Sequence, residues 1–411
     1  MTNHNRLLLL IILGTVLGVL FGTFFPKQAV TVDFLGDLFM NALKMMVLPL
    51  IITSMLVGIT NLGDVRKLGS VGGKTVFYYL VTTGIAVFIG IVLVQIIQPG
   101  VGVGAFSGEI PDSIKEKEAS SFAAGLVSIV SSVLLDIVHP NLVHAAVQLK
   151  ILPIIFASIL FGVAFTLIGE SAQPVIHFFR VLNEAVMKVV GWVILFTPIG
   201  VFALIASQLG EVGGGAAVGE LLAKIGKYCF AVIAGLLIHG FVILPLILHF
   251  FGRRNPFQYF VNLSKAILTA FGTGSSSATL PLTMDGVKEA KVRNETSSVV
   301  LPLGATVNMD GTALYEAVAA IFIAQSYGVP LGLEQLIVIF LTATLAAIGA
   351  AGIPQAGLVT MVLVLQSVGL PTEGIGLILA IDWFLDRCRT TVNVWGDAVG
   401  AAVVDRWEGA S

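Results

Sequence analysis

One stretch near the carboxyl end decides the class of fold. Residues 381–397 read IDWFLDRCRTTVNVWGD, and apolar segments flank this run on both sides. Five of its residues are ionisable: Asp382, Asp386, Arg387, Arg389 and Asp397. In a helix that crosses a membrane, each such residue facing lipid would cost about 2.5–3.5 kcal/mol, or of order ten kcal/mol together. The run therefore predicts a span whose polar side chains face protein or water.

The composition of the whole chain places this span in a membrane. Of the 411 residues, 56% are hydrophobic and 11% are charged, against roughly 25% charged in a soluble domain. This excludes a soluble enzyme and a disordered chain. The net charge of −2 leaves no electrostatic basis for nucleic-acid binding. The cysteines, Cys229 and Cys388, match no disulfide, zinc or redox pattern.

Apolar stretches long enough to cross a bilayer recur along the chain. We expect eight spans, at 7–25, 34–62, 75–98, 121–168, 175–210, 217–252, 297–326 and 373–404. The sequence thus predicts an all-α polytopic membrane protein. Lys and Arg residues in the short loops divide ten to five in favour of the side that carries the termini, which predicts that both termini are cytoplasmic.

Two further apolar stretches, 257–292 and 333–368, are interrupted by small residues. Their middles read FGTGSSS (271–277) and AAIGAAGIP (346–354). Each is either a re-entrant helical hairpin or a span kinked at glycine. A polar-studded span follows each one, and such a repeated unit is typical of the inverted repeats of secondary transporters.

The polar residues of the last span share one helix face. At 100° of rotation per helical residue, these side chains all point within about 60° of one direction around the helix axis. Besides Asp386, they are Asp382, Arg389, Thr390, Asn393 and Asp397. This face is either a functional site or a structural ion-pair network. Arg389 can hold a carboxylate through two hydrogen bonds and Asp386 can hold an ammonium, a combination that suits an amino acid.

The preceding span carries NMDGT at 308–312. Gly311 beside Asn and Asp favours local unwinding, which frees carbonyls that a hard cation such as Na⁺ can use. Asp310 and Asp397 have no obvious basic partner in the sequence. They predict a cation or a proton as counter-charge, with a polar kink between helices as the alternative. Glu316 is a third lone carboxyl, while Ser275–Ser277 forms either a flexible turn or an anion-binding tip.

These motifs, in this order, resemble the glutamate/aspartate transporter family, the dicarboxylate/amino-acid:cation symporters. The resemblance covers the whole span pattern and is most specific over 270–405. The runs DWFLDR (382–387) and Tyr315-Glu316 look closer to the animal excitatory amino-acid transporters than to archaeal members. The resemblance implies an elevator-type fold and a homotrimer. A scaffold and trimerisation domain would comprise 1–70 and 121–212, and a moving transport domain 71–103 and 213–405.

The family's binding residues carry over by motif. Substrate contacts would come from Ser276, Thr312, Ile353, Gly357, Asp386, Arg389, Thr390 and Asn393. One Na⁺ site would use Gly304, Asn308, Asn393 and Asp397. A second would use Thr306, Met309, Ala347, Ile348 and Ala350. A third would use Tyr79, Thr82, Thr83, Asn308 and Asp310.

Two departures from the archaeal pattern point to additional coupled ions. Gly274 stands where archaeal members have an arginine, and Arg387 supplies a guanidinium instead. Glu316 replaces an archaeal glutamine. Both changes resemble transporters that carry a proton inward and K⁺ outward, with Glu316, Arg387 and Asp382 as the coupling candidates.

The resulting hypothesis is Na⁺-driven uptake of L-glutamate and/or L-aspartate through the plasma (cell inner) membrane. The alternative is a C4-dicarboxylate:cation symporter, which Asp386 disfavours because it would repel a dicarboxylate. Arg389 disfavours a neutral amino-acid carrier. A dedicated anion channel would not need a close-packed amino-acid site. No nucleophile–base pair indicates an enzyme, and we expect membrane lipid around the chain but no covalent cofactor.

Overall fold

The computed structural model describes residues 3–61, 69–101, 135, 137–148, 150–211, 216–349 and 356–409, and every regular element within these ranges is helical. Five helical runs in this part of the chain are long and apolar enough to cross a membrane: Pro26–Thr60, Val71–Ile97, Leu152–Leu195, Ala223–Phe250 and Asn294–Ser326. Shorter apolar helices accompany them. The chain is a multi-pass membrane protein. That it has eight spans remains a prediction.

The distribution of side chains supports a membrane setting. Large apolar groups lie on the outside, as at Phe88 (61% exposed) and Ile96 (73% exposed), while the charged residues on the polar face of the last helix are buried; they are Asp382, Asp386, Arg389 and Asp397. A soluble protein would show the opposite arrangement, since exposed apolar surface of this extent calls for an apolar partner. Lipid is that partner here.

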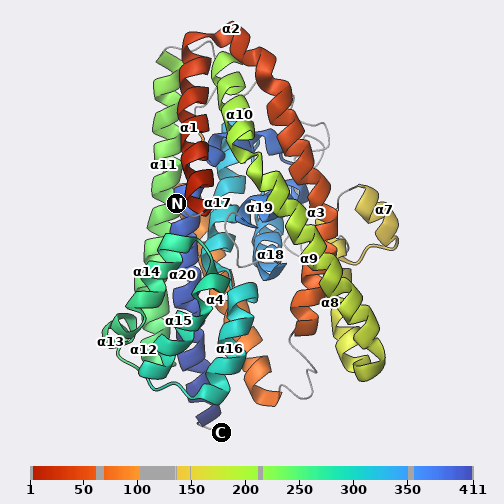
Figure 1. Cartoon of the computed structure of the whole chain (residues 1–411), viewed down its shortest axis with the longest axis vertical. Helices are drawn as coiled ribbons and strands as arrows, with labels where there is room; N and C mark the ends of the chain where they lie inside the picture. Colours follow the sequence, from red (N-terminus) through yellow and green to blue (C-terminus); the bar gives the residue numbers. More distant parts are fainter. Residues whose placement is uncertain are drawn as a thin grey trace.

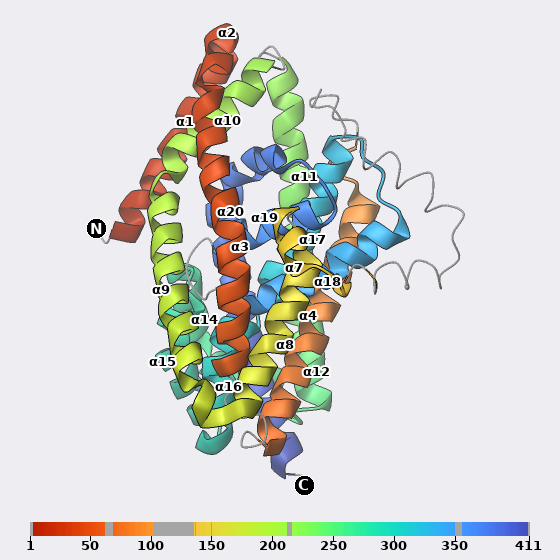
Figure 2. The same cartoon turned by 90° about the vertical axis from the view of Figure 1, so that its right-hand side faces the viewer.

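One group of helices forms from the first part of the chain. Its members are α1 (Asn3–Phe24), α2 (Pro26–Ala29), α3 (Asp33–Asn61), α8 (Ile151–Ile168), α9 (Gln173–Leu195) and α10 (Thr197–Glu211). These helices pack on one another, with α7 (Leu142–Val147) against α8 (Figures 1 and 2). The expected single span 175–210 is divided at Phe196, between α9 and α10.

A glycine stripe sets the contact between α1 and α10. Gly14, Gly18 and Gly22 recur every four residues, and a Cβ at these positions would lie 2.4, 2.8 and 2.7 Å from atoms of α10. Only glycine permits this approach of two helix backbones, as in small-residue interfaces of membrane helices generally.

The second group is formed mainly by helices from the second half of the chain. They are α4 (Gly69–Ile97), α11 (Ala216–Ile238), α12 (Leu244–Phe250), α16 (Asn294–Val307), α17 (Asp310–Ser326) and α20 (Ile375–Gly409). α17 packs against both α4 and α20, so α17 lies inside this group and is almost entirely buried (Figure 1). The groups meet where α3 contacts α18 (Leu333–Gly349) and α19 (Ala356–Ser367) and where α10 contacts α20.

The first small-residue stretch forms a helical pair. α13 (Pro256–Asn262) leads into α14 (Ser264–Thr273) and α15 (Ser276–Glu289), which pack together and on α20. Gly274 takes a left-handed φ of 63° between them, and Ser275 caps α15 by accepting a hydrogen bond from the Ala278 amide. The chain reverses here, which favours the hairpin over a kinked span. α18 and α19 also pack together, and the tip between them lies outside the described residues.

The unwinding expected at Gly311 lies two residues earlier than the sequence suggested. α16 ends at Val307, Asn308 and Met309 are non-helical, and α17 begins at Asp310. Gly311 is helical instead, and a Cβ there would lie 2.7 Å from the Arg389 carbonyl oxygen. Gly311 therefore permits close approach of α17 to α20 and does not itself break the helix.

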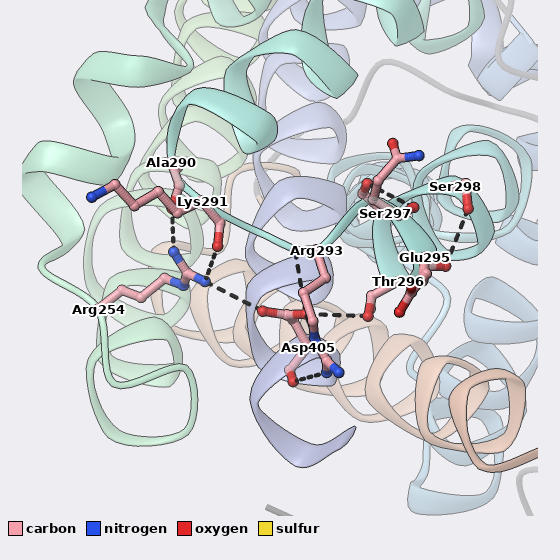
Figure 3. Close-up of polar contacts among 10 residues, drawn as sticks. Arg254, Ala290, Lys291, Arg293, Glu295, Thr296, Ser297, Ser298 and Asp405 are labelled. Atoms are coloured by element: carbon pink, nitrogen blue, oxygen red, sulfur yellow. Dashed lines mark hydrogen bonds and ion pairs between the residues drawn. The ribbon is translucent and has the colours of Figure 1, made fainter. Parts of the chain in front are cut away.

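Asp405, near the end of α20, ties this helix to the base of the α14–α15 hairpin (Figure 3). Its Oδ1 accepts hydrogen bonds from Arg293 Nε at 2.7 Å and Thr296 Oγ1 at 3.2 Å. Arg254 Nη2 reaches Oδ2 at 3.4 Å and also donates to the Lys291 carbonyl. Through its hydrogen bonds and charge, Asp405 raises the pKa of Arg293.

We expect Asp405→Ala to lower the melting temperature of the purified protein by several degrees. The change removes the shared acceptor of two guanidinium groups and leaves the ends of α15, α16 and α20 without their common connection. Differential scanning fluorimetry in detergent measures the shift. Glu295→Ala, at an exposed position two residues from Arg293, is the control and should melt with the parent; equal melting of Asp405→Ala and the parent would contradict this role.

Candidate functional site

A buried ion-pair triad on α20 forms the centre of the site. Arg389 Nη1 contacts Asp382 Oδ1 at 3.0 Å and Nη2 contacts Asp386 Oδ1 at 2.8 Å. The guanidinium lies over the Tyr315 ring, 3.8 Å from its centroid. Arg389 is only 1% exposed, and the predicted polar face of this helix is thus confirmed as an interior face. In this structure the Arg389 guanidinium is paired with two carboxylates of its own helix.

The beginning of α17 lies directly against this triad. Asn393 accepts a hydrogen bond from the Gly311 amide at 2.7 Å and donates one to Thr312 Oγ1 at 3.2 Å. A Cβ on Gly357, near the start of α19, would lie 3.2 Å from the Thr312 methyl group and 3.4 Å from Arg389 Nη1. Backbone of the second hairpin therefore reaches both the hydroxyl-bearing residue and the guanidinium.

The structure thus brings together most of the predicted substrate residues. Thr312, Gly357, Asp386, Arg389 and Asn393 are neighbours through the contacts above. The Thr390 hydroxyl donates to the Asp386 carbonyl at 2.8 Å. Ser276 is buried at the first residue of α15, in the hairpin that packs on α20. Ile353 lies outside the described residues.

Asp397 lies on the same face of α20, one turn beyond Asn393. Its Oδ1 accepts a hydrogen bond from Asn308 Nδ2 at 2.9 Å. A Cβ on Gly304 would lie 2.5 Å from this carboxylate oxygen and 2.6 Å from the Tyr79 hydroxyl. Both oxygens therefore lie close to the α16 backbone at Gly304, where a side chain would displace them. Asn308 Oδ1 is buried without a hydrogen-bond partner in the described part of the chain. These oxygens form a donor set that a hard cation favours.

Asp310 has more partners than the sequence indicated. Thr83 Oγ1 donates to Asp310 Oδ1 at 2.7 Å, and Thr82 Oγ1 lies 3.4 Å from the same oxygen. The expectation that Asp310 lacks a basic partner is wrong, because His239 Nε2 lies 2.9 Å from Asp310 Oδ2 and both side chains are fully buried. Sequence reasoning missed His239. The available signal was a histidine in the middle of the apolar run 217–252, well before the second histidine, His249, near its end.

The second predicted Na⁺ set is only partly described. Met309 is 3% exposed, and its sulfur accepts a hydrogen bond from Asn393 at 3.2 Å. Ala347 is buried and Ile348 partly buried near the end of α18, which packs on α16 and α17. Thr306 is half-buried, and its hydroxyl donates to the Leu303 carbonyl. Ala350 lies outside the described residues.

Comparison with known proteins shows the family of this chain. The model of the sodium:dicarboxylate symporter family matches residues 7–407. The chain belongs to the sodium:dicarboxylate symporter family. The putative sodium-dependent excitatory amino acid transporter glt-4 of Caenorhabditis elegans is 38% identical over 99% of this chain and 90% of its own length. Human excitatory amino acid transporter 2 is 37% identical over 97% of this chain and 78% of its own length. Human excitatory amino acid transporter 5 is 39% identical over 98% of this chain and 82% of its own length.

In this member of the sodium:dicarboxylate symporter family, Glu316 is not an isolated carboxyl. It is completely buried one turn beyond Thr312, and the Thr360 hydroxyl of α19 donates a hydrogen bond to its Oε1. Its Oε2 is buried without a hydrogen-bond partner within the described ranges. Arg387 lies off the triad's face, half-buried, with Nη1 donating to the Trp383 carbonyl at 2.9 Å. Glu316 therefore connects α17 to the second hairpin.

Proposed function

We propose that this protein is a Na⁺-driven symporter that takes up L-glutamate and/or L-aspartate through the plasma (cell inner) membrane. The observation that carries the proposal is the Asp382–Arg389–Asp386 triad beside Thr312 and Gly357. A substrate side-chain carboxylate would replace Asp386 on Arg389, and the released Asp386 would hold the substrate ammonium. Binding would exchange one internal ion pair for two ion pairs with substrate, so that neither Arg389 nor Asp386 would be left as an unpaired buried charge. The relatives are excitatory amino acid transporters by name, which supports an amino acid as substrate.

The clusters around Asp397 and Asp310 would hold the driving Na⁺ ions, and the set under the second hairpin would hold another. Asn393 supports this coupling, since it contacts Gly311 and Thr312 at the substrate side and Met309 at the helix break. Cations bound at the break would fix the backbone that Asn393 joins to the substrate site. Substrate affinity would then depend on Na⁺ concentration.

Transport would follow an elevator motion in a homotrimer, with both termini cytoplasmic. The first group of helices would be the scaffold, and the second group, with its two hairpins as inverted repeats, would move. The Lys44–Glu373 ion pair supports such a boundary, because it joins α3 to the turn before α20 at 3.0 Å with both side chains partly exposed. An exposed pair of this kind contributes little stability, so it can break during movement.

The test is uptake of labelled L-aspartate and L-glutamate into proteoliposomes under separately imposed Na⁺, K⁺ and pH gradients. We expect concentrative uptake only with an inward Na⁺ gradient, inhibited by both acidic amino acids and not by serine. Competition by succinate or malate at equal concentration would instead support the C4-dicarboxylate symporter. Uptake that is independent of the Na⁺ gradient would contradict the proposal.

Proton and K⁺ coupling would depend on Glu316. We expect Glu316→Gln to keep Na⁺-dependent exchange of amino acid, to lose the pH dependence of substrate binding and to no longer require internal K⁺. The amide imitates the protonated carboxyl permanently and keeps an oxygen for the Thr360 hydroxyl. Net uptake and exchange are measured with internal K⁺ replaced by a non-transported cation.

The exposed Glu295→Gln is the matched control and should retain the behaviour of the parent. If Glu316→Gln depends on internal K⁺ and on pH as strongly as the parent does, Glu316 is a structural residue and the proton-carrier role is wrong.

A further inference from the structure

His239 occupies a defect in an otherwise regular helix. Between α11 and α12, residues His239–Ile243 form a π-helical turn, which widens the helix by one residue. Single π-helical turns are rare in proteins, and those that occur often lie at functional sites. This one contacts both α4 and α20, the two helices that flank Asp310. The irregular turn is therefore at the point where the histidine meets the carboxylate.

A contact from α20 holds the π turn in place. Trp395 Nε1 donates a hydrogen bond to the Gly240 carbonyl at 2.9 Å, and Trp395 itself is 3% exposed. A carbonyl of the widened turn thus has a partner outside its own helix. Trp395 lies two residues from Asp397, so the same segment of α20 carries a proposed cation ligand and the support for His239.

The two oxygens of Asp310 have different partners. Oδ2 pairs with His239 Nε2 at 2.9 Å, while Oδ1 faces the Thr82 and Thr83 hydroxyls. His239 Nδ1 is buried without a hydrogen-bond partner in the described residues. A hydrogen on Nε2 fits this arrangement, since Nε2 then donates to the Asp310 carboxylate and Nδ1 places a lone pair, not an N–H group, at the unpartnered position.

We infer that His239 is a positioning residue for the cation site at Asp310, an inference that rests on the function proposed above. By donating to Oδ2, His239 fixes the rotation of the carboxylate and directs Oδ1 toward the threonine hydroxyls, where a cation would bind. Outer partners of this kind orient metal ligands, and their loss typically lowers metal affinity by about 10- to 100-fold. His239 acts on the ion through Asp310 and does not touch it.

The test is a double-mutant cycle read as the Na⁺ concentration that half-saturates L-aspartate binding to the purified full chain. We expect His239→Leu to raise this concentration about 10- to 100-fold and to leave the aspartate-to-glutamate preference at saturating Na⁺ unchanged. In an Asp310→Asn background, His239→Leu should add less than about twofold, because a residue that acts through another has no independent effect.

Three further variants separate positioning from packing. His239→Gln can reach Oδ2 with an amide N–H and should recover most of the Na⁺ affinity, whereas the shorter His239→Asn should not; this pair remains informative if the Leu variant fails to fold. His249→Leu, an exposed histidine on α12, is the control and should match the parent.

Three results overturn the inference. If Asp310→Asn raises the Na⁺ requirement and His239→Leu does not, or if the two changes are additive, His239 is a packing residue while the proposed cation site stands. If Asp310→Asn leaves the Na⁺ requirement unchanged, the cation site itself fails and the role of His239 fails with it.

Discussion

Arg389→Ala should lower binding of L-aspartate and L-glutamate by several hundredfold. In the substrate complex this change would leave a buried carboxylate without its partner, which costs roughly 3–5 kcal/mol. Small neutral amino acids such as serine have no side-chain carboxylate, so their binding should change little. The measurement is equilibrium binding of both substrate types at saturating Na⁺.

Arg389→Lys is the matched control for charge. Lysine keeps the positive charge but lacks the planar fork that pairs with a carboxylate through two hydrogen bonds and that lies over the Tyr315 ring. We expect an intermediate loss for acidic substrates. An equal loss of aspartate and serine in Arg389→Ala would mean that the triad supports the fold of α20 and does not select the substrate.

Asp397→Asn should raise the Na⁺ concentration required for substrate binding by about tenfold or more. Two unit charges 4 Å apart interact with about 4 kcal/mol at an effective dielectric constant of 20, and ~1.4 kcal/mol already corresponds to tenfold. Asparagine keeps the size of the side chain and an oxygen for Asn308 Nδ2, so that mainly the charge is lost. Substrate preference should not change.

Asp310→Asn should also raise the Na⁺ requirement, since its carboxylate belongs to a separate cluster with Thr82 and Thr83. Asp285→Asn, in the last turns of α15 and outside both clusters, is the control and should match the parent. Na⁺ dependence that is unchanged in both single variants would contradict the assignment of these carboxylates to cation sites. A changed substrate preference would place the affected residue in the amino-acid site instead.

Much of the site could be predicted because helical periodicity is a local property. Residues 382–397 follow one another on a single helix, so their spacing alone placed Asp382, Asp386, Arg389, Asn393 and Asp397 on one face, and their cost in lipid predicted that this face is buried. The small-residue run at 271–277 likewise indicated either a reversal or a kinked span, and the structure favours the reversal, with Gly274 in the left-handed conformation that glycine adopts readily. These features depend on neighbours within a few turns of chain.

Only the tertiary structure decided which groups meet across helices. His239 and Asp310 are separated by 71 residues, Glu316 and Thr360 by 44, and Tyr79 and Val300 by 221. The structure also showed that Gly311 serves close packing on Arg389, while the break falls at Asn308 and Met309. Sequence determined which face of each helix is polar, because that depends on the 3.6-residue repeat. The partner of each polar group depends on how the helices pack, and a single helix carries no information about the surface it will contact.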